Sequence, residues 1–99
     1  MQTDNLIIPS VSDIADAKIR LKGVIEETPL LFNKNLSEAY GARIYLKRED
    51  LQVVRSYKIR GAYNKMSVLK DSEKINGVVC ASAGNHAQGV AYACRLLDI

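Results

Sequence analysis

The chain has 99 residues, of which 47% are hydrophobic and 25% are charged, a globular composition that excludes a wholly disordered, collagen-like or low-complexity protein. Its apolar runs are only a few residues long, whereas a transmembrane helix needs about 20 residues, so no membrane span is expected. The net charge is +3, and two cysteines without a secretory signal at the N-terminus predict a cytoplasmic protein with reduced thiols.

The positive charge is concentrated in one part of the chain. Residues 43–60 contain six basic side chains against Glu49 and Asp50, a local charge of +4 where the whole chain carries +3. Such a stretch could neutralise a bound phosphate or carboxylate, or it could be a solvated charged loop. The charge by itself does not separate these two interpretations.

The first part of the chain predicts a flexible lead-in over residues 1–11, followed by a helix that begins at Ser12. Ser12 can cap this helix, and apolar residues then recur at helical spacing as far as Val24. A Thr-Pro pair favours extended backbone before residues 30–32. Residues 35–40 are typical of a short helix that the next glycine ends.

The second part predicts a strand over residues 43–47, a charged loop, and a long helix that begins at Ser56. Residues 77–81 have the length and branching of a strand buried on both faces, and residues 87–97 return as a helix. This order predicts an α/β fold, a partial three-layer arrangement with parallel strands. Since two or three strands do not make a covered parallel sheet, residues 12–99 are expected to form an incomplete domain.

The first candidate for chemistry is residues 56–62, where a loop passes into a helix. A serine caps the helix, so Lys58 lies in the first turn, where a structural helix prefers an acid. The helix dipole and the neighbouring Arg55 and Arg60 disfavour the charged ammonium, as a lysine that attacks a carbonyl requires. Gly61 costs about 1 kcal/mol relative to alanine inside a helix, which is easier to accept if something packs against its backbone. An ordinary basic helix start is the alternative.

The second candidate is residues 82–89, where a strand turns into a helix through small residues. The turn and the helix N-terminus present free backbone N–H groups that suit an anion, and Asn85 adds a donor and an acceptor. His86 is more typical of a polar loop residue than of a metal ligand, since no second histidine or cysteine pair gives metal spacing. Glycine-rich nucleotide motifs and G-x-S-x-G are absent, and Cys80 and Cys94 lie in apolar contexts that do not favour a nucleophile. An amine beside an anion-binding turn suits a carbonyl cofactor whose substrate carries a carboxylate.

Both segments resemble the signatures of a known family. Residues 47–52 and 55–62, Lys-Arg-Glu-Asp-Leu-Gln and Arg-Ser-Tyr-Lys-Ile-Arg-Gly-Ala, are similar to the lysine signature of threonine dehydratases, also called threonine deaminases. These are pyridoxal-phosphate lyases of the second fold type. Residues 81–91 resemble their second signature almost residue for residue. The uninterrupted Lys-Arg-Glu-Asp-Leu-Gln segment at residues 47–52 resembles the biosynthetic, isoleucine-pathway branch more than the catabolic one. Tyr57 departs from the family, which usually has phenylalanine there.

The resemblance implies a role for each matching position. Lys58 would hold pyridoxal 5'-phosphate covalently, Tyr57 would lie beside the cofactor ring, and Asn85 would hydrogen-bond the oxygen of the ring hydroxyl. The turn that binds the substrate carboxylate would consist of Ser82, Ala83, Gly84, Asn85 and His86.

The implied activity is the conversion of L-threonine, or alternatively L-serine, to a 2-oxo acid and ammonia; threonine gives 2-oxobutanoate. The family's phosphate-binding loop and regulatory domain would lie beyond Ile99, so the 99-residue piece would be inactive alone and would hold the cofactor weakly. In the full-length protein a homo-oligomer is expected.

Other interpretations remain open at this stage. The placement of the cofactor-binding lysine at a helix start is shared by four other enzymes: serine racemase, catabolic serine/threonine dehydratase, threonine synthase and cysteine synthase. A non-catalytic remnant and a basic nucleic-acid-binding module are the alternatives from other classes. The nucleic-acid module is disfavoured because Tyr45 and Tyr57 are the only aromatic residues in the basic stretch and suggest no stacking platform. Neither a nucleic acid nor a membrane is expected as a partner.

Overall fold

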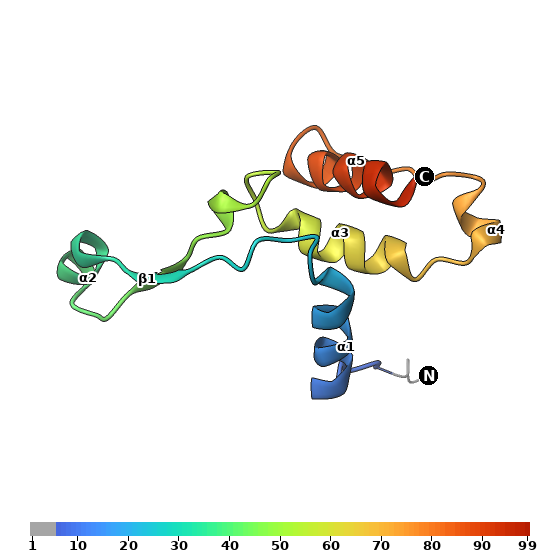
Figure 1. Cartoon of the computed structure of the whole chain (residues 1–99). Coiled ribbons are helices and arrows are strands. Elements are labelled where there is room, and N and C mark those ends of the chain that lie inside the picture. Colours follow the sequence, from blue (N-terminus) through green and yellow to red (C-terminus); the bar gives the residue numbers. More distant parts are fainter. Residues whose placement is uncertain (1–5) are drawn as a thin grey trace, which may run out of the picture.

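The computed structural model describes residues 6–99 (Figure 1). Of the predicted lead-in over residues 1–11, residues 1–5 lie outside the described part, and residues 6–10 are exposed and precede the first helix. Helix α1 spans Val11–Leu21 and is capped by Ser10, not by Ser12 as predicted. The Ser10 hydroxyl accepts from the Asp13 N–H at 3.1 Å, and the Asp13 carboxylate accepts from the Ser10 N–H at 2.7 Å. This reciprocal pair needs an acid three residues after the cap, which Ser12 lacks because Ala15 stands there.

A two-stranded arm extends away from the helices (Figure 1). Strands β1 (Leu30–Phe32) and β2 (Tyr45–Lys47) pair antiparallel, with Leu31 opposite Leu46. Helix α2 (Lys34–Tyr40) joins them, and Gly41 ends it in the left-handed conformation at φ 61°. The extended segment and the short helix predicted from the sequence are therefore confirmed.

The predicted strand over residues 77–81 does not form in the described part of the chain, and neither do the predicted parallel strands. Residues 78–81 make no backbone hydrogen bond with the rest of the described chain, and Val79 is 99% exposed. The only sheet found among residues 6–99 is the antiparallel β1–β2 pair. Branched apolar residues favour a strand, but a strand forms only beside a neighbour that pairs its N–H and C=O groups. No such neighbour lies next to residues 77–81 here.

The core is the contact between two helices that lie side by side with their N-terminal ends at the same end of the pair (Figure 1). Helix α3 spans Lys58–Ser67 and helix α5 spans Asn85–Leu97. The 3-10 turn η1 (Glu49–Leu51) precedes α3 in the chain, and the short helix α4 (Asp71–Lys74) follows it. The buried apolar side chains of this core are Val54, Ile59, Ala62, Met66 and Ala93.

The chain exposes more surface than a compact protein of its mass, and large apolar side chains such as Leu30, Phe32 and Val79 are among the exposed residues. Its accessible area is 7988 Å², whereas a compact protein of this mass exposes roughly 5,600 Å². Its radius of gyration is 17.0 Å, against about 13 Å for a compact domain of this length. No helix in residues 6–99 is long and apolar enough to cross a membrane.

Candidate active site

Lys58 lies in the first turn of α3, as predicted, but the helix begins at Lys58 itself and not at Ser56. No acid stands in that first turn. The buried Ser56 hydroxyl accepts from the Lys58 backbone N–H at 3.4 Å, although Tyr57 occupies the formal cap position. The Lys58 side chain is half-buried, and its Nζ lies 5.2 Å from the centroid of the Tyr57 ring, which is 60% exposed. Within residues 6–99 no ion pair holds this ammonium. The amine is therefore available to a ligand.

The turn before α5 is organised by the Ser82 hydroxyl. Its Oγ accepts from the backbone N–H groups of Gly84 and Ala87, each at 3.2 Å. Asn85 opens the helix two residues earlier than predicted, and Ser82 through His86 are exposed. In the described part of the chain the backbone N–H groups of Asn85 and His86 have no acceptor. Two donors at the positive end of α5 are thus free for an anion.

The two candidate segments meet at Gly89, which is buried in α5 one helical turn after Asn85. A Cβ built on Gly89 would lie 3.1 Å from the carbonyl carbon of Lys58 and 3.2 Å from both its Cβ and its carbonyl oxygen. Four residues of helix rise about 6 Å, so the Lys58 backbone lies about one turn from the asparagine. No close neighbour in residues 6–99 accounts for Gly61 inside α3, because Gly61 is exposed and a Cβ built on it would meet nothing within 4 Å.

A network around Glu49 fixes the approach to α3. Arg60 donates to both carboxylate oxygens of Glu49, Nε to Oε1 and Nη2 to Oε2, the second bond at 3.1 Å. Thr28 Oγ1 donates to Oε2 at 2.6 Å, and Gln52 Nε2 donates to it at 3.2 Å. Hydrogen bonding from Arg60 is the largest influence on the pKa of Glu49, and burial, the next largest, opposes it. With the hydrogen bonds from Thr28 and Gln52, the net effect lowers the pKa of Glu49 from 4.5 to about 2. Sequence reasoning treated Glu49 only as a charge within the motif.

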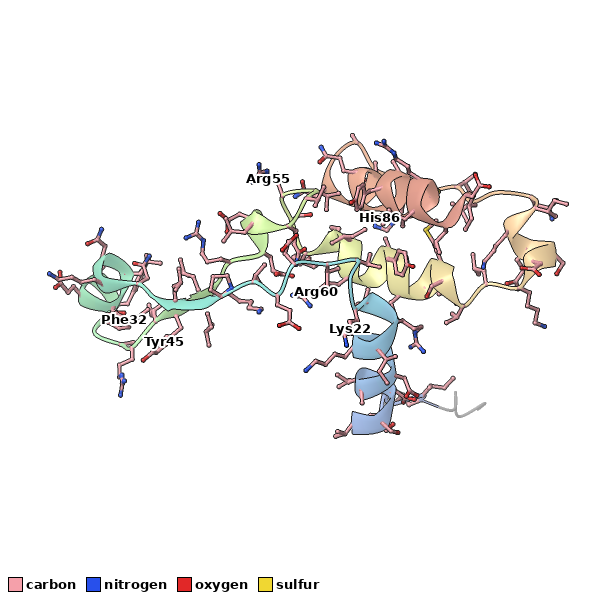
Figure 2. The ribbon with its side chains drawn as sticks, viewed as in Figure 1. Lys22, Phe32, Tyr45, Arg55, Arg60 and His86 are labelled. Carbon is pink, nitrogen blue, oxygen red and sulfur yellow. The ribbon has the colours of Figure 1, made fainter. Side chains whose placement is uncertain are left out.

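Much of the basic stretch is paired locally. Arg48 binds Asp50 through two hydrogen bonds of 2.8 and 2.7 Å, and Lys47 donates its Nζ to the Thr28 carbonyl. Figure 2 shows Arg55 on the loop before α3, where its side chain is exposed, and His86 in the first turn of α5. Of the two arginines near Lys58, Arg55 is therefore exposed to solvent, whereas Arg60 forms an ion pair with Glu49.

Residues 21–99 match the family model described as "Pyridoxal-phosphate dependent enzyme". The match covers most of the chain, and it includes the lysine-bearing helix and the asparagine-bearing turn that the geometry brings together. The chain belongs to the family of pyridoxal-phosphate dependent enzymes.

Within that family the chain is similar to threonine dehydratases. It is 58% identical over 90 residues to L-threonine dehydratase biosynthetic IlvA of Staphylococcus epidermidis, covering 91% of this chain and 21% of the relative. It is 57% identical over 90 residues to the protein of the same name from Staphylococcus aureus, with the same coverage. The chain thus spans about one fifth of the length of these curated relatives.

Solved structures agree with these relatives. A threonine deaminase from T.th. matches with a TM-score of 0.78 and 41% identity over 92% of this chain and 32% of that one. Threonine deaminase isoform 2 of Solanum lycopersicum matches with a TM-score of 0.71 and 42% identity over 91% of this chain and 26% of that one. Maize serine racemase gives a TM-score of 0.81 with 34% identity over 90% of this chain and 28% of that one. These matches confirm the predicted α/β class of fold-type II pyridoxal-phosphate enzymes, although the parallel strands predicted within this chain do not form in residues 6–99.

The residues present fit pyridoxal phosphate, the cofactor of this family. The cofactor is an aldehyde, and Lys58 offers a primary amine that no ion pair within residues 6–99 occupies. The open face of Tyr57 and the exposed amide of Asn85 can contact an aromatic ring and its hydroxyl oxygen. In residues 6–99 no group of three or more histidine, cysteine, aspartate or glutamate side chains could hold a metal ion.

Proposed function

We propose that this chain is the lysine-bearing N-terminal part of a longer biosynthetic threonine dehydratase that converts L-threonine to 2-oxobutanoate and ammonia in isoleucine biosynthesis. The proposal rests on one observation, the close contact of the Lys58 backbone with Gly89, one helical turn from Asn85. The chain that makes this contact is 58% identical over 90 residues to a biosynthetic L-threonine dehydratase. In the proposal, residues 12–99 belong to the catalytic domain.

In this proposal each site residue of the chain has its own role in binding or in proton transfer. Lys58 binds the cofactor through its amine and, once released, accepts the proton from Cα of the substrate. The free N–H groups of Asn85 and His86, with the turn from Ser82 that supports them, bind the substrate carboxylate. The Asn85 amide hydrogen-bonds the ring hydroxyl oxygen of the cofactor, and Tyr57 lies beside the ring. Bound pyridoxal phosphate supplies an electron sink that stabilises negative charge at Cα.

Holding the carboxylate at the α5 turn orients the substrate, because the Cα–H bond must point at the base that removes its proton. The proposed role is supported by the place of Lys58 at the N-terminal end of α3, because α3 and α5 begin at the same end of the helix pair (Figure 1). In the same proposal the enzyme is a cytoplasmic homo-oligomer that acts on a small amino acid. The extensive apolar surface of this chain supports its burial against further protein.

A serine racemase is the second candidate. The chain superposes on maize serine racemase with a TM-score of 0.81, slightly above the 0.78 found for the T.th. threonine deaminase, while its sequence identity is lower, 34% against 41%. The greater identity favours a dehydratase, since side chains rather than backbone decide the reaction.

A substrate panel with the full-length enzyme tests the proposal. We expect L-threonine to yield 2-oxobutanoate in a reaction that Lys58→Ala abolishes and Lys65→Ala, which alters an exposed lysine further along α3, leaves intact. Conversion of L-serine to D-serine without 2-oxobutanoate from threonine would favour the racemase. The 99-residue chain alone is expected to be inactive, and 2-oxobutanoate formed by it from threonine would refute that expectation.

A further inference from the structure

Gly89 makes a backbone contact that leaves no room for a side chain. The atoms a Cβ would meet, at 3.1 to 3.2 Å, are the carbonyl carbon, carbonyl oxygen and Cβ of Lys58. None of these atoms is the end of a flexible side chain, so none can rotate aside. A methyl group at Gly89 therefore requires the start of α3 to move by a few tenths of an ångström relative to α5.

The packed core around this contact leaves the start of α3, at Lys58, as the part that must move. Ile59, next to Lys58, is 2% exposed, and Ala93, one turn after Gly89, is fully buried. Both belong to the same packed core between α3 and α5. Because a close-packed interface does not absorb added volume locally, the added methyl group shifts the two helix starts relative to each other.

The two helix starts carry the two halves of the site. Lys58 opens α3 and Asn85 opens α5, four residues before Gly89. Since a helix is rigid over one turn, the depth of the contact at Gly89 sets the separation between the amine and the asparagine-bearing turn. A glycine gives the smallest separation that two helices can reach at this point.

We propose that Gly89 is a positioning residue that sets the distance from Lys58 to the anion-binding turn, so that both reach one bound cofactor and substrate. This inference rests on the proposed function above and deepens it. It concerns geometry at Lys58 and is separate from the contribution of Gly89 to stability.

The test compares two glycines inside helices. Gly89→Ala adds a methyl group against Lys58, whereas Gly61→Ala adds one in α3 where residues 6–99 place nothing within 4 Å. A displacement of 1 Å costs roughly a hundredfold in rate. A few tenths of an ångström thus predicts a loss of about fourfold to tenfold in kcat for Gly89→Ala. The same variant should bind pyridoxal phosphate more weakly and show a changed absorbance of the lysine-bound cofactor, while KM for threonine changes less than kcat.

The readouts separate the possible failures. Wild-type kcat, cofactor affinity and absorbance in Gly89→Ala would overturn the inference, as would an equal loss in Gly61→Ala, while the proposed function would stand. A full-length wild-type enzyme that forms no link between Lys58 and the cofactor would overturn the proposed function itself. If Gly89→Ala does not fold, the double variant Ile59→Val/Gly89→Ala, which removes a buried methylene from the same core, is compared with Ile59→Val. Equal cofactor absorbance in that pair would likewise overturn the inference.

Discussion

Glutamine in place of Glu49 removes the charge at the centre of the network that joins η1 to α3. The Glu49 side chain is only 15% exposed and Arg60 is 34% exposed. The fall in the pKa of Glu49 from 4.5 to about 2 corresponds to at most about 3 kcal/mol. Solvent at Arg60 screens the pair, so we expect Glu49→Gln to cost about 1 to 2 kcal/mol of unfolding free energy near neutral pH.

The effect has a defined pH dependence. The folded protein holds this carboxyl at a lower pKa than the unfolded protein, so the unfolded state binds more protons as the pH falls. The stability that Glu49 contributes is therefore complete above about pH 5 and is lost progressively toward about pH 2. The difference between wild type and Glu49→Gln should shrink over that window.

Denaturant unfolding of the full-length enzyme at a series of pH values measures this difference. Asp50→Asn is the matched control, since Asp50 pairs with Arg48 at the surface and its side chain is 57% exposed. We expect little change in that variant. A cost for Glu49→Gln that equals that of Asp50→Asn, or that does not change with pH, would refute the role assigned to the network.

Three further predictions concern single side chains. Gln52 is 1% exposed and forms two hydrogen bonds of 2.9 Å with the Glu26 backbone. Gln52→Ala should therefore lower the unfolding free energy by about 2 kcal/mol in a denaturant titration, and an unchanged unfolding free energy would contradict this. Ser10→Ala should cost about 1 kcal/mol by the same measurement while Ser12→Ala costs less, and the reverse order would restore the cap predicted from sequence. Ser82→Ala loses the two hydrogen bonds that shape the turn, so it should raise KM for threonine more than it lowers kcat, whereas an unchanged KM would remove Ser82 from carboxylate binding.

Features set by neighbouring residues were predictable from the sequence. The helix that Gly41 ends and the placement of Lys58 in the opening turn of α3 depend on caps and dipoles within a few positions, and both are confirmed. The N-cap of α1 lies two residues before the predicted Ser12, because two serines can cap the helix and only Ser10 has the acid that completes the capping box. The strand over residues 77–81 was wrong for the described chain because pairing needs a neighbour that local composition does not report.

The same limit applies to the candidate site. The chemical types of Lys58 and Asn85 point to an amine beside an anion-binding turn, and sequence patterns are enough to find them. The contact of Gly89 with Lys58 and the bonds that Thr28 and Arg60 donate to Glu49 join residues 11 to 31 positions apart. No periodicity or spacing rule predicts such pairs, although Gly89 does stand inside the motif that carried the resemblance.

The central claim, that Lys58 is the amine that binds the cofactor, can be tested by one direct measurement. The full-length enzyme is incubated with pyridoxal phosphate and reduced with borohydride, and the modified lysine is then located by peptide mass spectrometry. We expect the label on Lys58, with Lys65 of the same helix unmodified. A label on any other lysine, with Lys58 unmodified, would contradict the assignment.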